Sequence, residues 1–392
     1  MKILKPLRRQ LTAFSLIAIA CTAMTLDRAI TMKVTVENEV NQTNEQQDNQ
    51  AALSDAPKEA SLFQPQGLLI ETVAGQILRS QNADLAYNPA SGVKILTALA
   101  VLHQLGPQFR FKTKVRYQGT IRNQVLTGTI SFDGCDPFFN QEQLVQLAKE
   151  FTNRGIQNAA ASLAASSDFV FQAQSGNRTI AALYRALRKT KLKLRQPRMT
   201  YQPSHNSTSG DITLESKPLL DIVKDCLSRS DNVIAEKLGL LVGGPAMVSQ
   251  IAMEQTGLPA NSISLQTSSG LGINRVTPRA MITILSQFKV FLKSQNLDLS
   301  DALPVAGIDH GTIFKRFAKS KIKGAMTAKT GTLKETDHGA SVLVGELSTQ
   351  NQGKILFVVF QKGRNTARLR QQQNQLVEQL LVSSGGPGGK YK

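Results

Sequence analysis

Apolar positions along the chain follow two different periods, and these periods predict where strands and helices lie. Alternation of apolar and polar residues is typical of strands, whereas apolar residues three to four apart are typical of helices. Strands are predicted over 67–73, 76–79, 109–117, 125–132, 324–331, 340–347 and 354–361. Helices are predicted over 91–105, 141–154, 179–189, 218–226, 232–242 and 366–381. Gly75 between the first two strands indicates a β-hairpin.

Three other stretches, residues 37–61, 166–210 and 384–392, lack a regular apolar pattern. Residues 37–61 are rich in Asn, Gln, Glu and Asp and hold too few large apolar residues to pack a core. The sequence therefore divides into an export segment or membrane anchor at 1–32, a disordered polar linker at 33–62, a folded body at 63–383 and a flexible, Gly-rich tail at 384–392. Within the body, the pattern is loose from 166 to 210.

The N-terminal segment resembles an export signal. Basic residues at positions 2, 5, 8 and 9 precede an apolar run from Leu11 to Ala20, which is short for a membrane-spanning helix. Cys21 directly follows the small-x-small sequence Ala18-Ile19-Ala20. Three outcomes stay open: a cleaved signal, a lipid-modified Cys21 that tethers the protein to the membrane, and an uncleaved anchor.

The charge of the chain points to an anionic neighbour. Lys and Arg number 46 against 28 Asp and Glu, a formal net charge of +18, which suits nucleic acid, an anionic polymer or a membrane surface. We find no nucleic-acid motif and expect no such partner. The four histidines show no metal-ligand spacing, so we expect no metal or organic cofactor. Cys135 and Cys226 are interpreted as buried thiols rather than a disulfide pair.

The predicted helix at 91–105 begins with a hydroxyl and an amine one turn apart. Ser91 and Lys94 lie on the same helix face, so the amine can reach the hydroxyl. A lysine with a lowered pKa can take the serine proton, and the helix N-terminus favours a developing oxyanion. The pattern alone is weak, because Ser286 with Lys289 and Ser320 with Lys323 repeat it and a Ser at this position is ordinarily a helix cap.

Two downstream motifs strengthen the hypothesis. Ser230-Asp231-Asn232 stands just ahead of a predicted helix, and Lys329-Thr330-Gly331-Thr332 lies in a predicted strand. Ser-Asp-Asn and Lys-Thr-Gly each occur once. With Ser-x-x-Lys, in this order, they form the signature of penicillin-binding proteins and class A β-lactamases.

Each residue of these motifs has a chemical reason. Ser230 supplies a second hydroxyl that passes a proton toward a leaving amine, and Asn232 offers an amide to the substrate backbone. Lys329 adds positive charge near a substrate carboxylate.

The remaining motif residues lie on the strand. Gly331 allows close approach of the substrate, and Thr330 and Thr332 present hydroxyls to a carboxylate. The backbone N–H groups of Ser91 and Thr332 are predicted to form the oxyanion hole.

At this point the chain resembles the serine D-Ala-D-Ala carboxypeptidase/endopeptidases of the class C penicillin-binding protein type, the penicillin-binding protein 4 family. Further blocks share the likeness: 88–91, 132–137, 274–279, 303–309 and 328–333. The resemblance covers roughly 67–381. It implies an α+β transpeptidase fold, with a five-stranded antiparallel sheet flanked by helices and the site between the sheet edge and a helical region.

The chain departs from the family pattern in three places. The interval between the first two motifs is short, so the accessory insertion, at about 133–215, is predicted to be reduced. Thr267-Ser268-Ser269-Gly270-Leu271 stands where the family usually shows Asp-Gly-Ser-Gly-Leu. The stretch from Leu333 to His338 is longer and more charged than the family's usual short turn, and we expect it to reshape the rim of the cleft.

The resemblance implies an exported, periplasmic or membrane-facing serine DD-peptidase. Its substrates would be peptidoglycan stem peptides, and β-lactams would inhibit it through an acyl-enzyme. Two alternatives remain. One is a non-catalytic peptidoglycan-binding envelope protein. The other is a β-lactamase, which we favour less because no Glu-x-x-Leu-Asn segment lies between Asn232 and Lys329.

Overall fold

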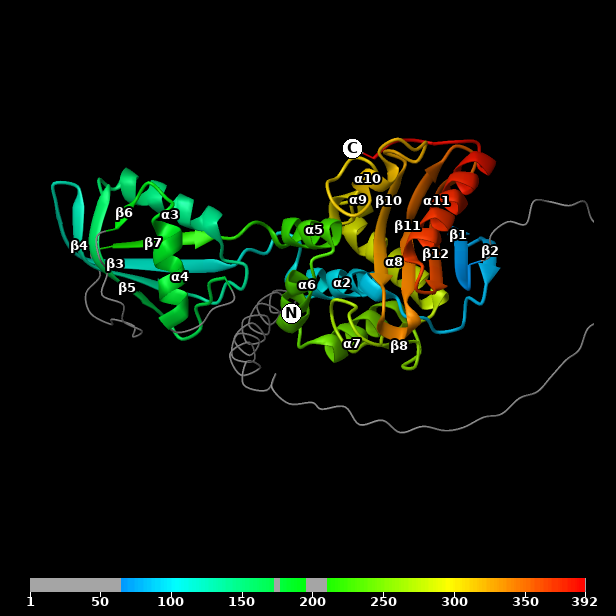
Figure 1. Cartoon of the computed structure of the whole chain (residues 1–392), viewed down its shortest axis with the longest axis horizontal. Helices are drawn as coiled ribbons and strands as arrows, with labels where there is room; N and C mark the ends of the chain where they lie inside the picture. The colour runs from blue at the N-terminus through cyan, green and yellow to red at the C-terminus, as the bar shows by residue number, and fades with distance from the viewer. Residues whose placement is uncertain (1–64, 173–176, 195–209, 392) are drawn as a thin grey trace, which may run out of the picture.

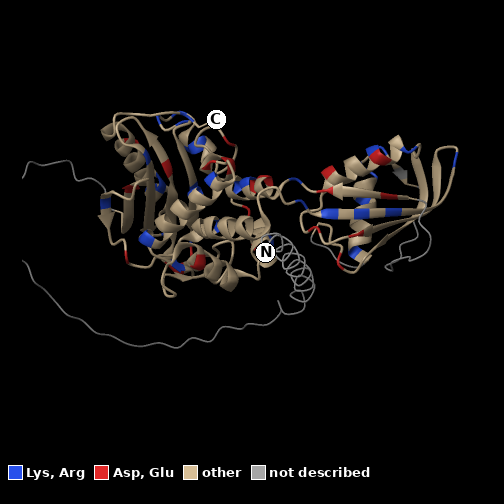
Figure 2. Ribbon diagram, turned by 180° about the vertical axis from the view of Figure 1, so that it is seen from behind, with Lys and Arg blue, Asp and Glu red and all other residues tan. Residues whose placement is uncertain are grey.

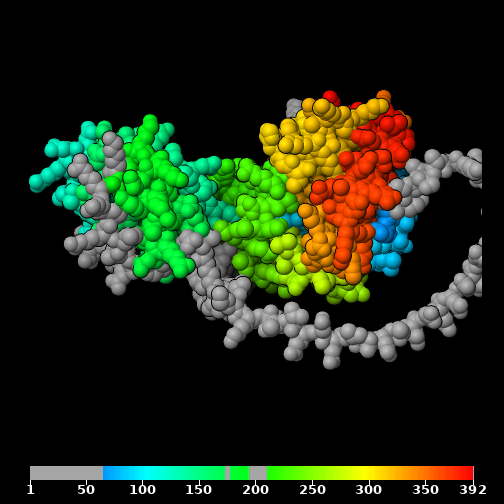
Figure 3. Space-filling view, in the orientation of Figure 1, coloured from blue at the N-terminus to red at the C-terminus, as the bar shows by residue number. Residues whose placement is uncertain are grey.

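The computed structural model describes residues 65–172, 177–194 and 210–391. The predicted export segment, the linker at 33–62 and Cys21 lie outside these residues. Among the helices that the structure describes, none has the length and apolar content to span a bilayer. Figures 1 and 3 show two lobes, and Figure 2 shows the same two lobes from behind. The insertion lobe comprises the described residues from 112 to 215, and the main lobe comprises the other described residues.

A five-stranded sheet forms the centre of the main lobe. Its strands are β1 (Gly67–Thr72), β2 (Ile77–Gln81), β10 (Met326–Leu333), β11 (Ala340–Thr349) and β12 (Gly353–Lys362). They run in the order β10-β11-β12-β1-β2, and every neighbouring pair is antiparallel. The predicted α+β fold with a five-stranded antiparallel sheet is confirmed. β10 forms one edge of the sheet, so the Lys329–Thr332 motif lies on an edge strand.

Helices, short strands and single turns complete the main lobe. In chain order they are η2 (Ala90–Gly92), α2 (Val93–Leu105), α5 (Leu219–Arg229), α6 (Asn232–Leu241), α7 (Pro245–Thr256), β8 (Ile263–Ser264), β9 (Arg275–Val276), α8 (Pro278–Ser294), α9 (Leu299–Ala302), α10 (Phe314–Phe317), η3 (Thr336–His338) and α11 (Thr366–Ser383).

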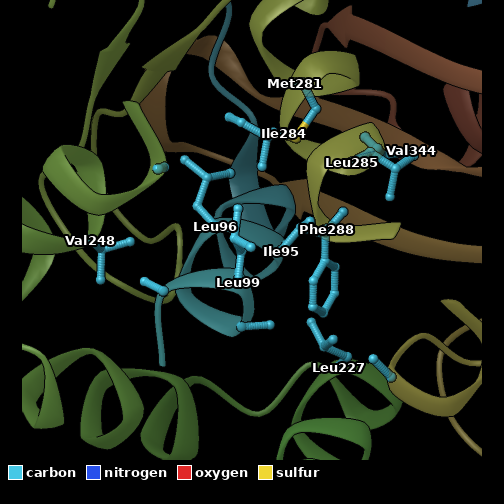
Figure 4. Close-up of a cluster of buried hydrophobic side chains, with 14 of the residues drawn as sticks. Ile95, Leu96, Leu99, Leu227, Val248, Met281, Ile284, Leu285, Phe288 and Val344 are labelled. Carbon is cyan, nitrogen blue, oxygen red and sulfur yellow. The ribbon is translucent and has the colours of Figure 1, made fainter. Parts of the chain in front are cut away.

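Alternate residues of the sheet feed two separate cores. Val342 and Val344 of β11 face the core around α2 and α8, whereas Leu343 between them faces the core beneath α11. Figure 4 shows α2 within the first core, with Leu99 of α2 near Phe288 of α8. Every residue of α2 from Val93 to Leu102 is buried. Because α2 is surrounded by packed side chains, its first turn is held firmly. That turn carries Lys94, and Ser91 lies in η2 directly before it.

The insertion lobe has a mixed sheet and a core of its own. Its elements are β3 (Lys112–Arg122), β4 (Val125–Asp133), α3 (Gln141–Asn153), β5 (Asn158–Ala165), α4 (Asn177–Leu187), β6 (Lys193–Leu194) and β7 (Gly210–Glu215). The strand order is β6-β5-β4-β3-β7. The predicted start of the insertion near 133 is corrected to about Lys112. β3 pairs with β4 and β7, so both predicted strands before 133 belong to this sheet.

The C-terminal tail, expected to be flexible, is instead docked through Tyr391. The Tyr391 hydroxyl donates to the Glu346 carboxylate at 2.6 Å, and its backbone N–H donates to Gly324 O at 2.8 Å. Gly388 N–H also bonds Ser348 O. Glu346 is fully buried, and a buried carboxylate requires hydrogen-bond donors. This requirement is not visible in the glycine-rich composition of the tail.

The two cysteines of the body do not pair with each other. Cys226 is buried and Cys135 is only partly buried, so the prediction of two buried thiols holds for Cys226 alone. Burial raises the pKa of the Cys226 thiol to about 12, which keeps it protonated and unreactive at neutral pH.

Candidate active site

Ser91 stands on a strained turn immediately before α2. Ala90 has a φ of +45°, in the left-handed region that residues with a Cβ rarely adopt. The Asn88 side chain accepts a hydrogen bond from Ala90 N–H at 3.1 Å and donates to Gly272 O at 3.0 Å. Asn88 therefore holds the turn in the conformation that presents Ser91 at the helix start. Strain of this kind is concentrated at functional sites.

Lys94 lies one turn beyond Ser91 and is buried beneath it. Its Nζ donates to Ser91 Oγ at 3.0 Å, to Asn232 Oδ1 at 2.7 Å and to Ser269 O at 2.6 Å. Burial lowers the pKa of Lys94 to about 8, although nearby negative charges, including Glu236, act in the opposite direction. An amine with this pKa is partly neutral near pH 7 and can accept the Ser91 proton.

The corner between α5 and α6 presents Ser230 and Asn232. Ser230 ends α5 with a φ of +58°, and the Asp231 carboxylate caps α6 by accepting from Ile234 N–H at 3.0 Å. The bend at Ser230 and the cap at Asp231 turn the chain sharply between the two helices. The side chains of Ser230 and Asn232, on either side of Asp231, therefore line the same cavity.

Lys329 of β10 is fully buried and does not line the cavity, although its neighbour Thr330 does. Its Nζ donates to Ser230 Oγ at 2.9 Å and to Thr330 O at 2.6 Å. Burial, together with the charge of Lys94, lowers the pKa of Lys329 well below its ordinary value. The amine thus contacts Ser230 and is buried below Thr330 and Thr332, whose side chains are partly exposed in the cleft.

Two glycines bring the backbone close to Ser91. A Cβ on Gly331 would lie 2.9 Å from Pro89 O and 3.1 Å from Ser91 N. Gly270 has a φ of +89°, and a Cβ there would lie 1.9 Å from Ala90 O. The edge strand and the 267–270 loop therefore pack directly against the Ser91 turn, and no larger residue fits without moving them.

A cavity of about 510 Å³ brings the predicted residues together. Five of them line it: Ser91, Ser230, Asn232, Thr330 and Thr332. Lys94 and Lys329 are buried behind the residues that line the cavity. Gly331 packs against the turn that carries Ser91. A cavity of about 660 Å³ lies between the lobes and is lined by none of the predicted site residues.

Thr267, where the family usually has Asp, closes its turn with a hydroxyl. Thr267 Oγ1 accepts from Gly270 N–H at 3.0 Å and donates to Leu271 O at 2.8 Å. The Glu236 carboxylate of α6 accepts the N–H groups of Ser268 and Ser269. The loop is therefore fixed by these groups, and its Ser269 carbonyl remains aimed at Lys94.

The turn after β10 is tied to the Ser91 turn. Asp337 accepts two hydrogen bonds from the Arg275 guanidinium, at 2.6 and 3.1 Å, and one from Asn88 Nδ2 at 3.3 Å. Asn88 in turn holds Ala90. The charged turn at 333–338 thus supports the turn that carries Ser91.

Two arginines in the cavity were not predicted from the sequence. Arg316 of α10 and Arg370 of α11 both line it, and Arg370 Nη2 donates to Thr332 Oγ1 at 3.0 Å. Arg316 lies shortly after the block at 303–309 that resembles the family, and this nearness was the one sequence feature that could have marked it as a site residue. Arg370 resembles the other arginines near the start of α11, and only the packing of that helix distinguishes it.

The sequence matches the D-Ala-D-Ala carboxypeptidase 3 (S13) family over residues 46–178 and 194–381. D-alanyl-D-alanine carboxypeptidase DacB of Haemophilus influenzae is 33% identical over 170 residues, which span 39% of this chain and 34% of that protein. Carboxypeptidase DacB of Mycolicibacterium smegmatis is 28% identical over 160 residues, spanning 36% and 33%. The matches thus cover about a third of each relative.

Solved structures share the fold over most of the chain. A penicillin G acylated predatory endopeptidase from Bdellovibrio bacteriovorus, in complex with an immunity protein, has a TM-score of 0.72 and 25% identity, covering 84% of this chain and 95% of that one. Penicillin binding protein 4 from Haemophilus influenzae has a TM-score of 0.59 and 22% identity, covering 80% and 96%. The resemblance inferred from the motifs is confirmed, and the chain belongs to the D-Ala-D-Ala carboxypeptidase 3 (S13) family.

Proposed function

We propose that this protein is a serine DD-peptidase that cleaves D-Ala-D-Ala termini, cross-links or both in peptidoglycan stem peptides. The observation that carries the proposal is the contact between Lys94 and Ser91: a desolvated amine with a pKa of about 8 lies 3.0 Å from a hydroxyl in an open cavity. The family match and the penicillin G acylated relative support the same chemistry.

Acylation begins when Ser91 Oγ attacks the penultimate D-Ala carbonyl. The Ser91 proton passes to Lys94 Nζ, and the carbonyl oxygen becomes an oxyanion that the N–H groups of Ser91 and Thr332 stabilise. The C–N bond then breaks. Lys94 returns its proton to the leaving amine by way of the Ser230 hydroxyl, which the hydrogen bond from Lys329 orients.

Deacylation reverses these roles. Water attacks the ester carbonyl and Lys94 takes the water proton. The C–Oγ bond breaks, and Ser91 Oγ recovers a proton from Lys94. Asn232 holds the substrate backbone, and Thr330 and Thr332 present hydroxyls to the substrate carboxylate. None of these proposed steps uses a metal or an organic cofactor. Because peptidoglycan lies outside the cytoplasmic membrane, we propose an exported location, in the periplasm or on the outer face of the cytoplasmic membrane.

Intact mass spectrometry after incubation with benzylpenicillin tests the nucleophile. We expect one stable penicilloyl adduct on the wild type and none on Ser91→Ala. Release of D-Ala from a D-Ala-D-Ala peptide, or cleavage of a cross-linked muropeptide, tests the substrate. A wild-type protein without an adduct and without cleavage would favour the peptidoglycan-binding alternative, whereas rapid nitrocefin turnover would favour a β-lactamase.

A further inference from the structure

Two arginines, Arg316 and Arg370, lie side by side in the active-site cavity. Neither Arg316 nor Arg370 forms a salt bridge with a carboxylate among the residues that the structure describes. Both line the cavity that holds Ser91. Two like charges are unfavourable at close range, and an anion between or beside them relieves the repulsion.

The arginines are held in place by specific contacts. Arg316 Nη2 donates to Arg370 O at 3.1 Å and to Gln373 Oε1 at 2.9 Å. Its guanidinium carbon lies 5.2 Å from the centre of the Phe317 ring. Burial and the charge of Arg370 lower the pKa of Arg316 to about 9. These contacts fix the start of α11 against α10 and leave the side chain of Arg370 directed at β10.

Arg370 reaches the Lys-Thr-Gly strand itself. Its Nη2 lies 3.0 Å from Thr332 Oγ1, on the face of β10 that also carries Thr330. Lys329, the cation predicted from the sequence to bind a carboxylate, is fully buried and contacts Ser230. The positive groups that line the open cavity beside Thr332 are therefore guanidiniums, which are well suited to bind a carboxylate through paired hydrogen bonds.

We propose that Arg370, together with Thr332, binds the free α-carboxylate of the residue that leaves the substrate, and that Arg316 is a positioning residue for Arg370. This inference rests on the proposed function and narrows it. An internal α-peptide bond has no carboxylate at that position. The site therefore selects a C-terminal residue, or a cross-link made through a side-chain amine whose own carboxylate is free.

Paired substrates test the assignment. kcat/KM is measured for an acylated L-Lys-D-Ala-D-Ala peptide with a free C-terminal acid and for the same peptide with a C-terminal amide. In Arg370→Gln we expect kcat/KM for the acid to fall about 10–100-fold, the size expected for a lost hydrogen bond between charged groups. The amide should lose less than about threefold, so the preference for the acid collapses. Arg316→Gln should move the ratio in the same direction by a smaller factor.

Arg368→Gln is the matched control, because Arg368 is exposed on the same helix and does not line the cavity. It should leave both substrates unchanged. Equal losses on acid and amide in Arg370→Gln, or an unchanged ratio, would overturn the carboxylate assignment.

Benzylpenicillin separates this failure from failure of the proposed function. If the wild type forms the Ser91 adduct and cleaves the acid substrate while Arg370→Gln keeps the wild-type ratio, only the role of Arg370 is refuted. If the wild type neither forms the adduct nor cleaves either peptide, the DD-peptidase proposal and the carboxylate assignment both fail.

Discussion

The Nζ atom of Lys94 lies 3.0 Å from Oγ of Ser91, and it also donates to the backbone carbonyl of Ser269. With a pKa of about 8, Lys94 is mainly protonated at pH 6 and mainly neutral at pH 9. Only the neutral amine can accept the serine proton. We therefore expect the rate of acylation by benzylpenicillin to rise about tenfold per pH unit below pH 7 and to level off above about pH 8. Time-resolved mass spectrometry from pH 5.5 to 9.5 checks this, and a flat profile would contradict the assignment of Lys94 as base.

Removal of the amine gives a second prediction. Lys94→Gln keeps a donor for Asn232 but lacks a base, so acylation should slow by about 10²–10⁴-fold, and the dependence on pH near 8 should disappear. Lys289→Gln provides the control for the competing motif at Ser286 and Lys289, because Lys289 binds Glu346 away from the cavity. Normal acylation in Lys94→Gln, with slow acylation in Lys289→Gln, would be the opposite of our expectation.

The close contact between Gly331 and the Ser91 turn gives a third prediction. In Gly331→Ala the new methyl group meets backbone atoms, Pro89 O at 2.9 Å and Ser91 N at 3.1 Å, so β10 must move away from Ser91. A displaced Thr332 N–H weakens the proposed oxyanion hole. Acylation should therefore slow by about 10–1,000-fold, since loss of one oxyanion donor costs up to about 10³.

Gly389→Ala is the matched glycine control, because the nearest atom to its added Cβ is 3.8 Å away. It should acylate at the wild-type rate. Both variants are compared by stopped-flow kinetics and thermal unfolding. An unchanged rate in Gly331→Ala would mean that β10 tolerates displacement at this point.

The local patterns of the sequence were sufficient for much of the fold and the centre of the site. The apolar residues of α2, α6 and the three strands from β10 to β12 follow clear helical or strand periods. The three motifs lie at the start of α2, at the corner between α5 and α6, and on the edge strand β10. The Ala-rich β5 was not predicted, because its strand character depends on parallel pairing with β4, a contact between distant residues.

Arg370 and the docked tail escaped prediction for the same physical reason. An arginine on an amphipathic helix is ordinarily solvated, and only the position of α11 against the sheet brings Arg370 to Thr332. Likewise, nothing near Tyr391 in the sequence indicates the buried Glu346 that it meets. Local period predicts elements, whereas contacts between elements decide which polar side chains enter a site.

The separate cores of the two lobes give the last prediction. Phe132 is fully buried in the insertion lobe, with ring centres 5.4 Å from Phe169 and 6.2 Å from Phe139. Phe288 is fully buried in the core around α2. Either Phe→Ala change should destabilise its own lobe by about 3–5 kcal/mol.

Because the two cores share no buried side chain, Phe132→Ala should speed hydrogen exchange within β3–β5 and leave penicillin acylation near the wild-type rate. Phe288→Ala should speed exchange in α2 and α8, and acylation should be lost at a lower temperature than in the wild type. Exchange followed by mass spectrometry, with acylated fraction measured in parallel, distinguishes the two. Loss of acylation in Phe132→Ala at 25 °C, with α2 still protected from exchange, would contradict the prediction. The insertion lobe would then have to support the active site through contacts between the two lobes.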